Sequence, residues 1–128
     1  MFSHVFVGVT DFERALVFYT PVLKALGLHQ RFIERDRPWA GWEMTGQARP
    51  LFLIGAPYDG AAQSVGNGQM VAFIATTREQ VGKVHAQAMA NGGRDEGVPG
   101  LRPEYHAHYY GAYFRDLDGN KFVACVWG

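Results

Sequence analysis

His4-Val-Phe-Val-Gly-Val-Thr10 is matched 66 residues further along the chain by Met70-Val-Ala-Phe-Ile-Ala-Thr76. Both stretches are rich in the β-branched and aromatic residues that favour strands. Each ends on a threonine with a glutamate three residues later, Glu13 or Glu79, which is typical of a capping box at the start of a helix. Two strand–helix units in phase indicate an internal duplication, and the cleft between the two copies is the natural place for a ligand.

The remaining segments extend the repeat to two larger modules. Gly27 and Gly93, also 66 residues apart, are expected to end the two helices, which cover residues 11–26 and about 77–91. Strands are expected at Leu28–Glu34, Ala40–Thr45, Leu51–Ile54, Tyr109–Arg115 and Lys121–Trp127. The stretch Gly92–Ala107 is expected to be irregular because of its glycines and prolines, and to serve as a mobile cover.

We therefore predict an α+β fold in which two tandem βαβββ modules form a half-barrel cleft. A single domain covers residues 1–128, with a first module at 1–58, a connector at 59–68 and a second module at 69–128. The connector is polar and rich in glycine, as expected of a linking segment.

Composition excludes several classes of partner. Twelve basic residues balance twelve acidic ones, so there is no excess positive charge for binding nucleic acid. No apolar run approaches the roughly 20 residues that span a membrane, and no leader is expected, because the first residues carry no basic segment or cleavage-like site. The one cysteine, Cys125, excludes an internal disulfide and suits a reducing cytoplasm.

The double βαβββ plan and several motifs resemble the vicinal oxygen chelate superfamily, which includes glyoxalase I, bleomycin and fosfomycin resistance proteins and extradiol dioxygenases. The motifs are His4 in the first strand, Asp11-x-x-Arg14-Ala-x-x-Phe18-Tyr19 in the first helix and Arg115-Asp-Leu-Asp-Gly-Asn-Lys121 near the end. The glycine-rich stretches from Gly66 to Phe73 and from Gly97 to Pro103 resemble those of an uncharacterised, glyoxalase-like branch of this superfamily. The resemblance implies the glyoxalase/bleomycin resistance fold and leaves the substrate open, since one scaffold hosts many chemistries.

The resemblance also implies where a divalent metal would bind. Enzymes of the family take ligands from the first strand, from a position late in the first half, from the first strand of the second half and from the last strand. These positions fall on His4, the segment around Leu51–Leu53, Met70 and Val123. Because only His4 is a ligand for a hard divalent metal, we expect no metal and no other cofactor.

Alternation along the strands predicts which residues face the cleft. His4, Phe6, Met70, Val123 and Cys125 should point into it. The helices should be faced by Val5, Val7, Val71, Phe73, Phe122 and Ala124.

The segment Tyr105–Tyr110 should lie at the mouth of the cleft, with His106, Tyr109 and Tyr110 in contact with the ligand. His106 and His108 could instead chelate a metal with Glu104 or Glu43, and His4 could be a packing residue. Arg102 and Arg115 could bind an anionic ligand, or pair with Glu104 and Asp116.

These residues favour a protein that binds a small, apolar or aromatic ligand in the cleft between the modules. The alternative is an enzyme of the superfamily, either a metal-dependent lyase, isomerase or dioxygenase with displaced ligands, or an acid–base catalyst using His4 or His106. A homodimer is expected, because a small half-barrel leaves sheet edges that gain from coverage.

Overall fold

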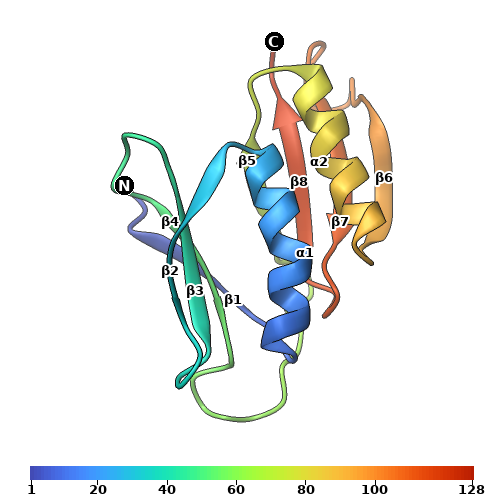
Figure 1. Cartoon of the computed structure of the whole chain (residues 1–128). Helices are drawn as coiled ribbons and strands as arrows, with labels where there is room; N and C mark the ends of the chain where they lie inside the picture. The colour runs from blue at the N-terminus through green and yellow to red at the C-terminus, as the bar shows by residue number, and fades with distance from the viewer.

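The structure is a computed structural model that describes residues 1–128, and it contains two copies of a βαβββ unit (Figure 1). The first copy consists of β1 (His4–Gly8), α1 (Phe12–Ala25), β2 (Leu28–Glu34), β3 (Trp39–Met44) and β4 (Leu51–Gly55). The second copy consists of β5 (Val71–Ile74), α2 (Arg78–Ala90), β6 (Arg94–Leu101), β7 (Tyr110–Arg115) and β8 (Lys121–Val126). The predicted fold class is confirmed.

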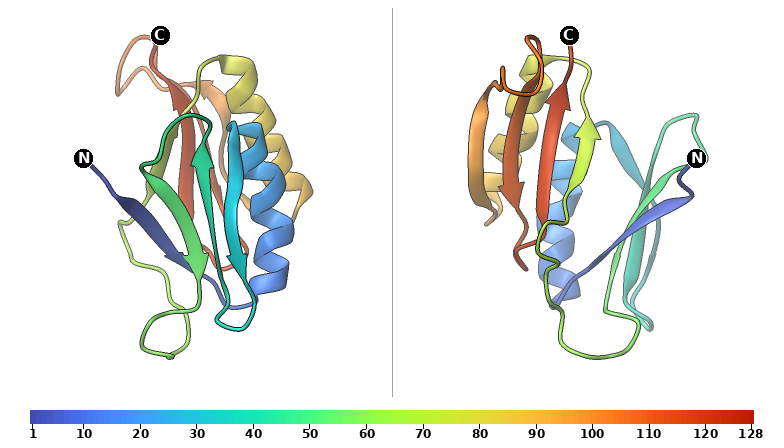
Figure 2. Two further views of the ribbon diagram at one scale, coloured as in Figure 1. Left: turned by 60° about the vertical axis from the view of Figure 1, so that its left-hand side comes forward. Right: turned by 180° about the vertical axis from the view of Figure 1, so that it is seen from behind.

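The two four-stranded sheets have the same strand order, β1-β4-β3-β2 and β5-β8-β7-β6. In each sheet the first strand pairs in parallel with the last, and the other pairs are antiparallel. β1 and β5 are therefore equivalent edge strands, and Figure 2 shows each at one side of its sheet. No helix is both long and apolar enough to cross a membrane.

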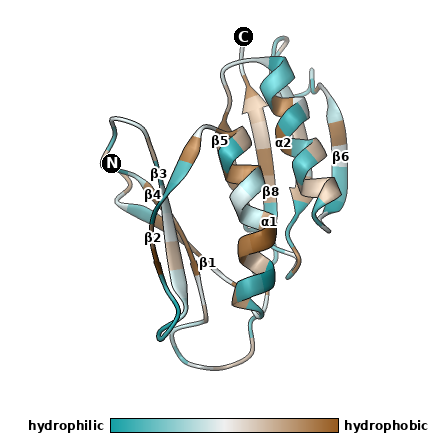
Figure 3. Ribbon diagram, viewed as in Figure 1, coloured by the Kyte–Doolittle hydropathy of each residue, from teal (hydrophilic) through white to brown (hydrophobic).

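The main hydrophobic core is built around α1, which packs against both sheets. The Tyr19 ring lies 5.5 Å from Phe52 of the first sheet and 5.9 Å from Phe122 of the second, measured between ring centres. Val84 and Ala88 of α2 complete this core. Hydrophobic and hydrophilic segments alternate along α1 in Figure 3, as expected of a helix with one buried side.

The strand faces predicted from alternation are confirmed. The core around α1 is joined by Val5, Val7, Val71, Phe73, Phe122 and Ala124. Val123 and Cys125 lie on the opposite face of β8, where they pack with Tyr109. The second sheet therefore has one face against the helices and another face free to form a site.

Both helices begin one residue later than predicted. The N-cap residues are Asp11 and Thr77, whose backbones are extended. Asp11 Oδ1 accepts a hydrogen bond from the Arg14 backbone N–H at 3.1 Å, and Thr77 Oγ1 accepts one from Gln80 at 3.0 Å. The predicted capping boxes at Thr10 and Thr76 are thus one residue too early. In each case the side chain of the next residue is better placed to accept a hydrogen bond from the first free N–H groups of the helix.

The second helix also ends one residue before the repeat predicts. Gly27, with φ of 87°, follows α1, but the left-handed residue after α2 is Gly92, with φ of 94°. The difference arises because α2 has 13 residues and α1 has 14. Gly93 has a different role, since a Cβ there would lie 2.8 Å from the Ala88 carbonyl oxygen and 2.9 Å from that of Arg115.

The stretch Gly92–Ala107 is not irregular throughout, as was predicted. Arg94–Leu101 forms β6, an edge strand paired with β7. Its register shifts between Asp95 and Gly97 and again between Gly97 and Gly100. These irregularities, and Pro99 between them, break the alternation that identifies a strand. Only residues 102–109 remain as a loop, so the predicted cover is much shorter.

Candidate functional site

A pocket of about 990 Å³ opens on the face of the second sheet that points away from the helices. This face lies in front of the helices in the right-hand view of Figure 2. We call it the aromatic pocket; its side chains are Met70, Ala72, Glu104, Tyr105, Tyr109, Tyr113, Arg115, Lys121, Val123, Cys125 and Trp127, with residues 65–68 of the connector and Gln69 along one side.

Tyr109 is the centre of the aromatic wall. Its ring meets Trp127 edge-on at 4.6 Å and Tyr105 at 5.4 Å between ring centres, and its hydroxyl lies 3.0 Å from the Tyr113 hydroxyl. Burial is the main cause that raises the pKa of Tyr109 above its ordinary value. This phenol therefore stays protonated and is available as a hydrogen-bond donor.

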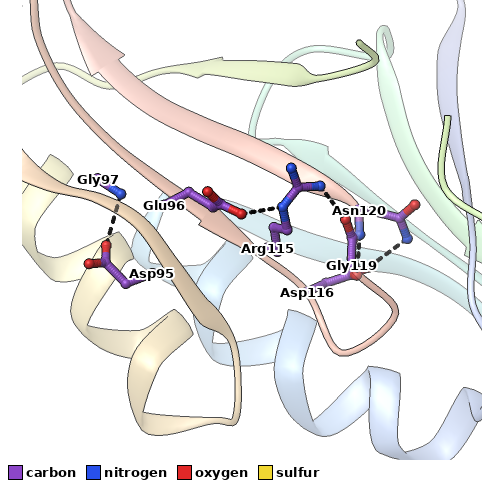
Figure 4. A network of polar contacts seen from close by, with 7 residues as sticks. All are labelled: Asp95, Glu96, Gly97, Arg115, Asp116, Gly119 and Asn120. Atoms are coloured by element: carbon purple, nitrogen blue, oxygen red, sulfur yellow. Dashed lines mark hydrogen bonds and ion pairs between the residues drawn. The ribbon is translucent and has the colours of Figure 1, made fainter. Parts of the chain in front are cut away.

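Two cationic side chains, Arg115 and Lys121, line the same pocket. The Arg115 guanidinium donates to the Glu96 carboxylate, and its Nη1 donates to the Gly119 carbonyl at 2.7 Å (Figure 4). The hydrogen bond from Arg115 lowers the pKa of Glu96. Lys121 forms no ion pair, and its Nζ lies 5.6 Å from the centre of the Tyr113 ring.

A buried polar network fixes the turn between β7 and β8, next to Lys121. Asp116 accepts hydrogen bonds from the Tyr19 hydroxyl and from the backbone N–H group of Asp118. It also accepts from the backbone N–H and the Nδ2 of Asn120 (Figure 4). Asn120 Nδ2 also donates to the Gly8 carbonyl at 3.0 Å. Burial raises the pKa values of both Asp116 and Tyr19. The network ties this turn to α1 and β1 and so holds the start of β8 in place.

A second cavity, of about 780 Å³, lies between the modules beneath the connector. Phe6 of β1 and Phe122 of β8 line it from opposite modules. Gln63 of the connector donates to Asn120 Oδ1 at 3.2 Å, which holds the connector against the second module. Met70 and Lys121 line both cavities, so the two are neighbours.

The family model of the Glyoxalase/Bleomycin resistance protein/Dioxygenase superfamily matches residues 1–124. This chain belongs to that superfamily. A glyoxalase/bleomycin resistance protein from Albidiferax ferrireducens T118 is 36% identical, with a TM-score of 0.83 over 98% of this chain and 97% of that one.

More distant solved structures share the fold. A hypothetical protein from S. aureus is 23% identical, with a TM-score of 0.71 over 98% of this chain and 92% of that one. A glyoxalase-related enzyme from Fulvimarina pelagi is 18% identical, with a TM-score of 0.74 over 98% and 87%. A search of curated proteins by sequence gave no match.

At the four positions where the superfamily resemblance implies metal ligands, the residues of this chain do not fit a metal. Met70 and Val123 line the aromatic pocket, while His4 lines neither cavity. The segment Leu51–Leu53 is buried and apolar. Nowhere in residues 1–128 do three or more His, Cys, Asp or Glu side chains come together in a group that could hold a metal ion.

Four of the predicted site residues come together. Met70, Tyr109, Val123 and Cys125 all line the aromatic pocket. Phe6 lies with Met70 in the cavity between the modules. The single cleft predicted from the sequence is therefore two adjacent cavities, and only the smaller one is bounded by β1.

His4 lines neither cavity, so the structure does not group it with Met70 or Val123. It lies exposed at the start of the edge strand β1, where its Nδ1 is 3.0 Å from the Ser3 hydroxyl. The two sheets meet on the side of α1, where Phe52 packs against Phe73 and Phe122, and His4 lies on the opposite face of β1.

The placement of Tyr110 in the cleft was wrong. Its ring packs on the helix side of the sheet with Ala75 and Val81, and the Arg78 guanidinium lies 5.0 Å from the ring centre. Because Tyr109 and Tyr110 are consecutive at the start of β7, their side chains point to opposite faces.

His106 lies outside the aromatic pocket, on the exposed loop beside it. Its ring is 6.0 Å from the Trp127 ring, and its Nδ1 accepts a hydrogen bond from the His108 backbone N–H at 3.1 Å. The His106 and His108 rings are 5.6 Å apart, with no third metal-ligating side chain in the group. The alternative of a metal held by this pair has no support in the geometry.

Tyr113, Lys121 and Trp127 line the aromatic pocket but were not among the predicted residues. Lys121 of β8 and Trp127, the residue after its end, follow the same alternation as Val123 and Cys125, so continuing it in both directions finds them. Tyr113 lies opposite Val123 in the β7–β8 pairing. Pairing the two strands of the predicted hairpin identifies it as well.

Proposed function

We propose that this superfamily member binds a small organic ligand in the aromatic pocket without the metal of its enzymatic relatives. One observation carries the proposal: Val123, at the expected position of a metal-binding glutamate, has no exposed surface and packs beneath Tyr109 and Cys125. The floor of the pocket is thus a hydrophobic surface. A concave apolar site with a few polar groups is the usual form of a small-molecule site.

Two further features of the proposal follow from composition. The free thiol of Cys125 is buried, which fits a protein of the reducing cytoplasm. The balance of basic and acidic residues, twelve of each, favours a small molecule over nucleic acid as the partner.

Binding can be followed at Met70 by NMR of protein labelled with ¹³C at its methionine methyl groups. The chain has four methionines, of which only Met70 lines the pocket. A set of small aromatic compounds should contain members that shift the Met70 signal and leave those of Met44 and Met89 unchanged. If no compound shifts Met70 selectively, the proposed site is wrong.

Protein purified without chelators should carry no stoichiometric zinc, nickel or iron. The physical reason is that a thioether and an alkyl group, at Met70 and Val123, cannot replace the nitrogen and oxygen ligands that such ions need. Elemental analysis measures this directly. A full equivalent of one metal per chain, lost in His4→Ala, would contradict the proposal.

We also propose that the protein is a homodimer. The edge strands β1 and β5 carry exposed apolar side chains, among them Phe6 and Ile74, which is 74% exposed. Unpaired strand edges of this kind favour association with another chain. Light scattering at micromolar concentration should give the mass of a dimer.

Ile74→Lys should weaken this dimer, because a lysine on an edge strand opposes strand pairing. Val17→Lys is the matched control, since Val17 is also exposed but lies on α1. A monomeric mass for the unmodified protein, or equal effects of the two substitutions, would contradict the proposed interface.

A further inference from the structure

The charges of the aromatic pocket point to the chemical class of its ligand. Arg115 is already neutralised by Glu96. Lys121, which is half-buried at the start of β8, forms no ion pair. Its ammonium lies against the face of the Tyr113 ring, and Glu96, the carboxylate whose pKa it helps to lower, is the one already paired with Arg115. An ammonium group in a partly desolvated site is stabilised by an anion placed beside it.

The paired phenols above Lys121 supply a second polar contact. Tyr109 and Tyr113 share one hydrogen bond, at 3.0 Å between their hydroxyl oxygens. Two hydroxyl groups have two protons, and the bond between them uses one. The other O–H can donate to Cys125 Sγ, the second hydrogen-bond partner of Tyr109, or to an oxygen atom of a bound ligand, and the raised pKa of Tyr109 keeps that phenol protonated.

The rest of the lining suits a flat, apolar body. Tyr105, Tyr109 and Trp127 form a continuous aromatic wall, with Tyr109 edge-on to both neighbours. Met70 lines the same pocket, and its flexible thioether makes favourable contacts with aromatic rings. Aromatic side chains bind a ring in offset-stacked or edge-to-face geometry.

We infer that the aromatic pocket binds a planar aromatic carboxylate, with the ring against Tyr105, Tyr109 and Trp127 and the carboxylate between Lys121 and the Tyr109–Tyr113 hydroxyl pair. The inference rests on the proposed function and adds the ligand class to it. A cationic ligand fits less well. The one carboxylate that lines the pocket, Glu104, lies on an exposed loop, where water screens its charge.

The test compares three probes with the same ring: 2-naphthoate, neutral 2-naphthylmethanol and 2-naphthylmethylammonium. Calorimetry should give a dissociation constant for 2-naphthoate at least about tenfold lower than for the alcohol, as expected of a charge-assisted hydrogen bond. Lys121→Met should remove most of this preference, measured as the ratio of the two dissociation constants. Lys83→Met, on the exposed side of α2, is the matched control and should keep the preference.

The Met70 methyl signal distinguishes a wrong ligand class from a wrong binding site. If 2-naphthoate and the alcohol both shift Met70 with equal affinity, the site is correct and the inference of an anionic ligand is wrong. If the ammonium probe binds most tightly, the inference is likewise overturned. If none of the three shifts Met70, both the ligand class and the proposed site fail. Equal thermal unfolding of Lys121→Met and the parent protein shows that a lost preference is not a loss of folding.

Discussion

Replacing Asp116 with alanine is expected to lower the free energy of unfolding by roughly 3 kcal/mol, because several buried donors lose their acceptor at once. The carboxylate accepts from the Tyr19 hydroxyl, from Asn120 Nδ2 and from two backbone N–H groups of the β7–β8 turn. Tyr19 is 1% exposed, so water cannot replace the lost bond. Urea denaturation followed by circular dichroism measures the change.

Asp118→Ala is the matched control for this experiment. Asp118 lies in the same turn, but its carboxylate accepts one bond, at 3.1 Å from the exposed Thr10 backbone N–H. Its loss should cost about 1 kcal/mol or less. Tyr19→Phe, which removes one donor of the network, should fall between the two. If Asp116→Ala and Asp118→Ala have equal effects, the network does not hold the turn as described.

The duplication predicted most of the fold because it constrains both halves together. A strand, a helix and three strands in one half imply the same order in the other, and the identical strand orders agree with this. The strand β6 was missed because its glycines and register shifts remove the alternation that identifies strands. The N-caps Asp11 and Thr77 were missed by one residue, because adjacent side chains compete for the same backbone N–H groups.

Alternation groups the second-module residues that line the aromatic pocket, but it does not show whether residues of the first module reach them. Alternation along one strand places Val123 and Cys125 on a common face, whatever the rest of the chain does. Whether His4 and Phe6 reach that face depends on how the modules pack. That arrangement is set by side-chain contacts of α1 with both sheets, such as those of Tyr19 with Phe52 and Phe122. No spacing in the sequence encodes it.

Val123→Glu, which places the expected metal-binding residue of the superfamily in β8, should lower the free energy of unfolding by roughly 3 kcal/mol at neutral pH. Val123 has no exposed surface and packs with Tyr109 and Cys125, so the new carboxylate would lie in an apolar contact. Lys121, two residues earlier on the same face, can offset only part of this cost. The loss should persist with zinc present, since no set of three ligands surrounds the position.

The pH dependence of Val123→Glu tests the cause of the destabilisation. Burial raises the pKa of the new carboxyl group in the folded state above its unfolded value, so the protonated form is favoured by folding. The cost should therefore be smallest at acid pH and should grow as the pH rises through the folded pKa. Ala72→Glu is the control, because Ala72 is exposed and pairs directly with Val123 across β5 and β8. That substitution should cost less than about 1 kcal/mol at any pH. A Val123→Glu protein that matches the Ala72→Glu control would contradict the apolar, buried position of Val123. One that regains its full stability on adding zinc would show that the floor of the pocket can still hold a metal.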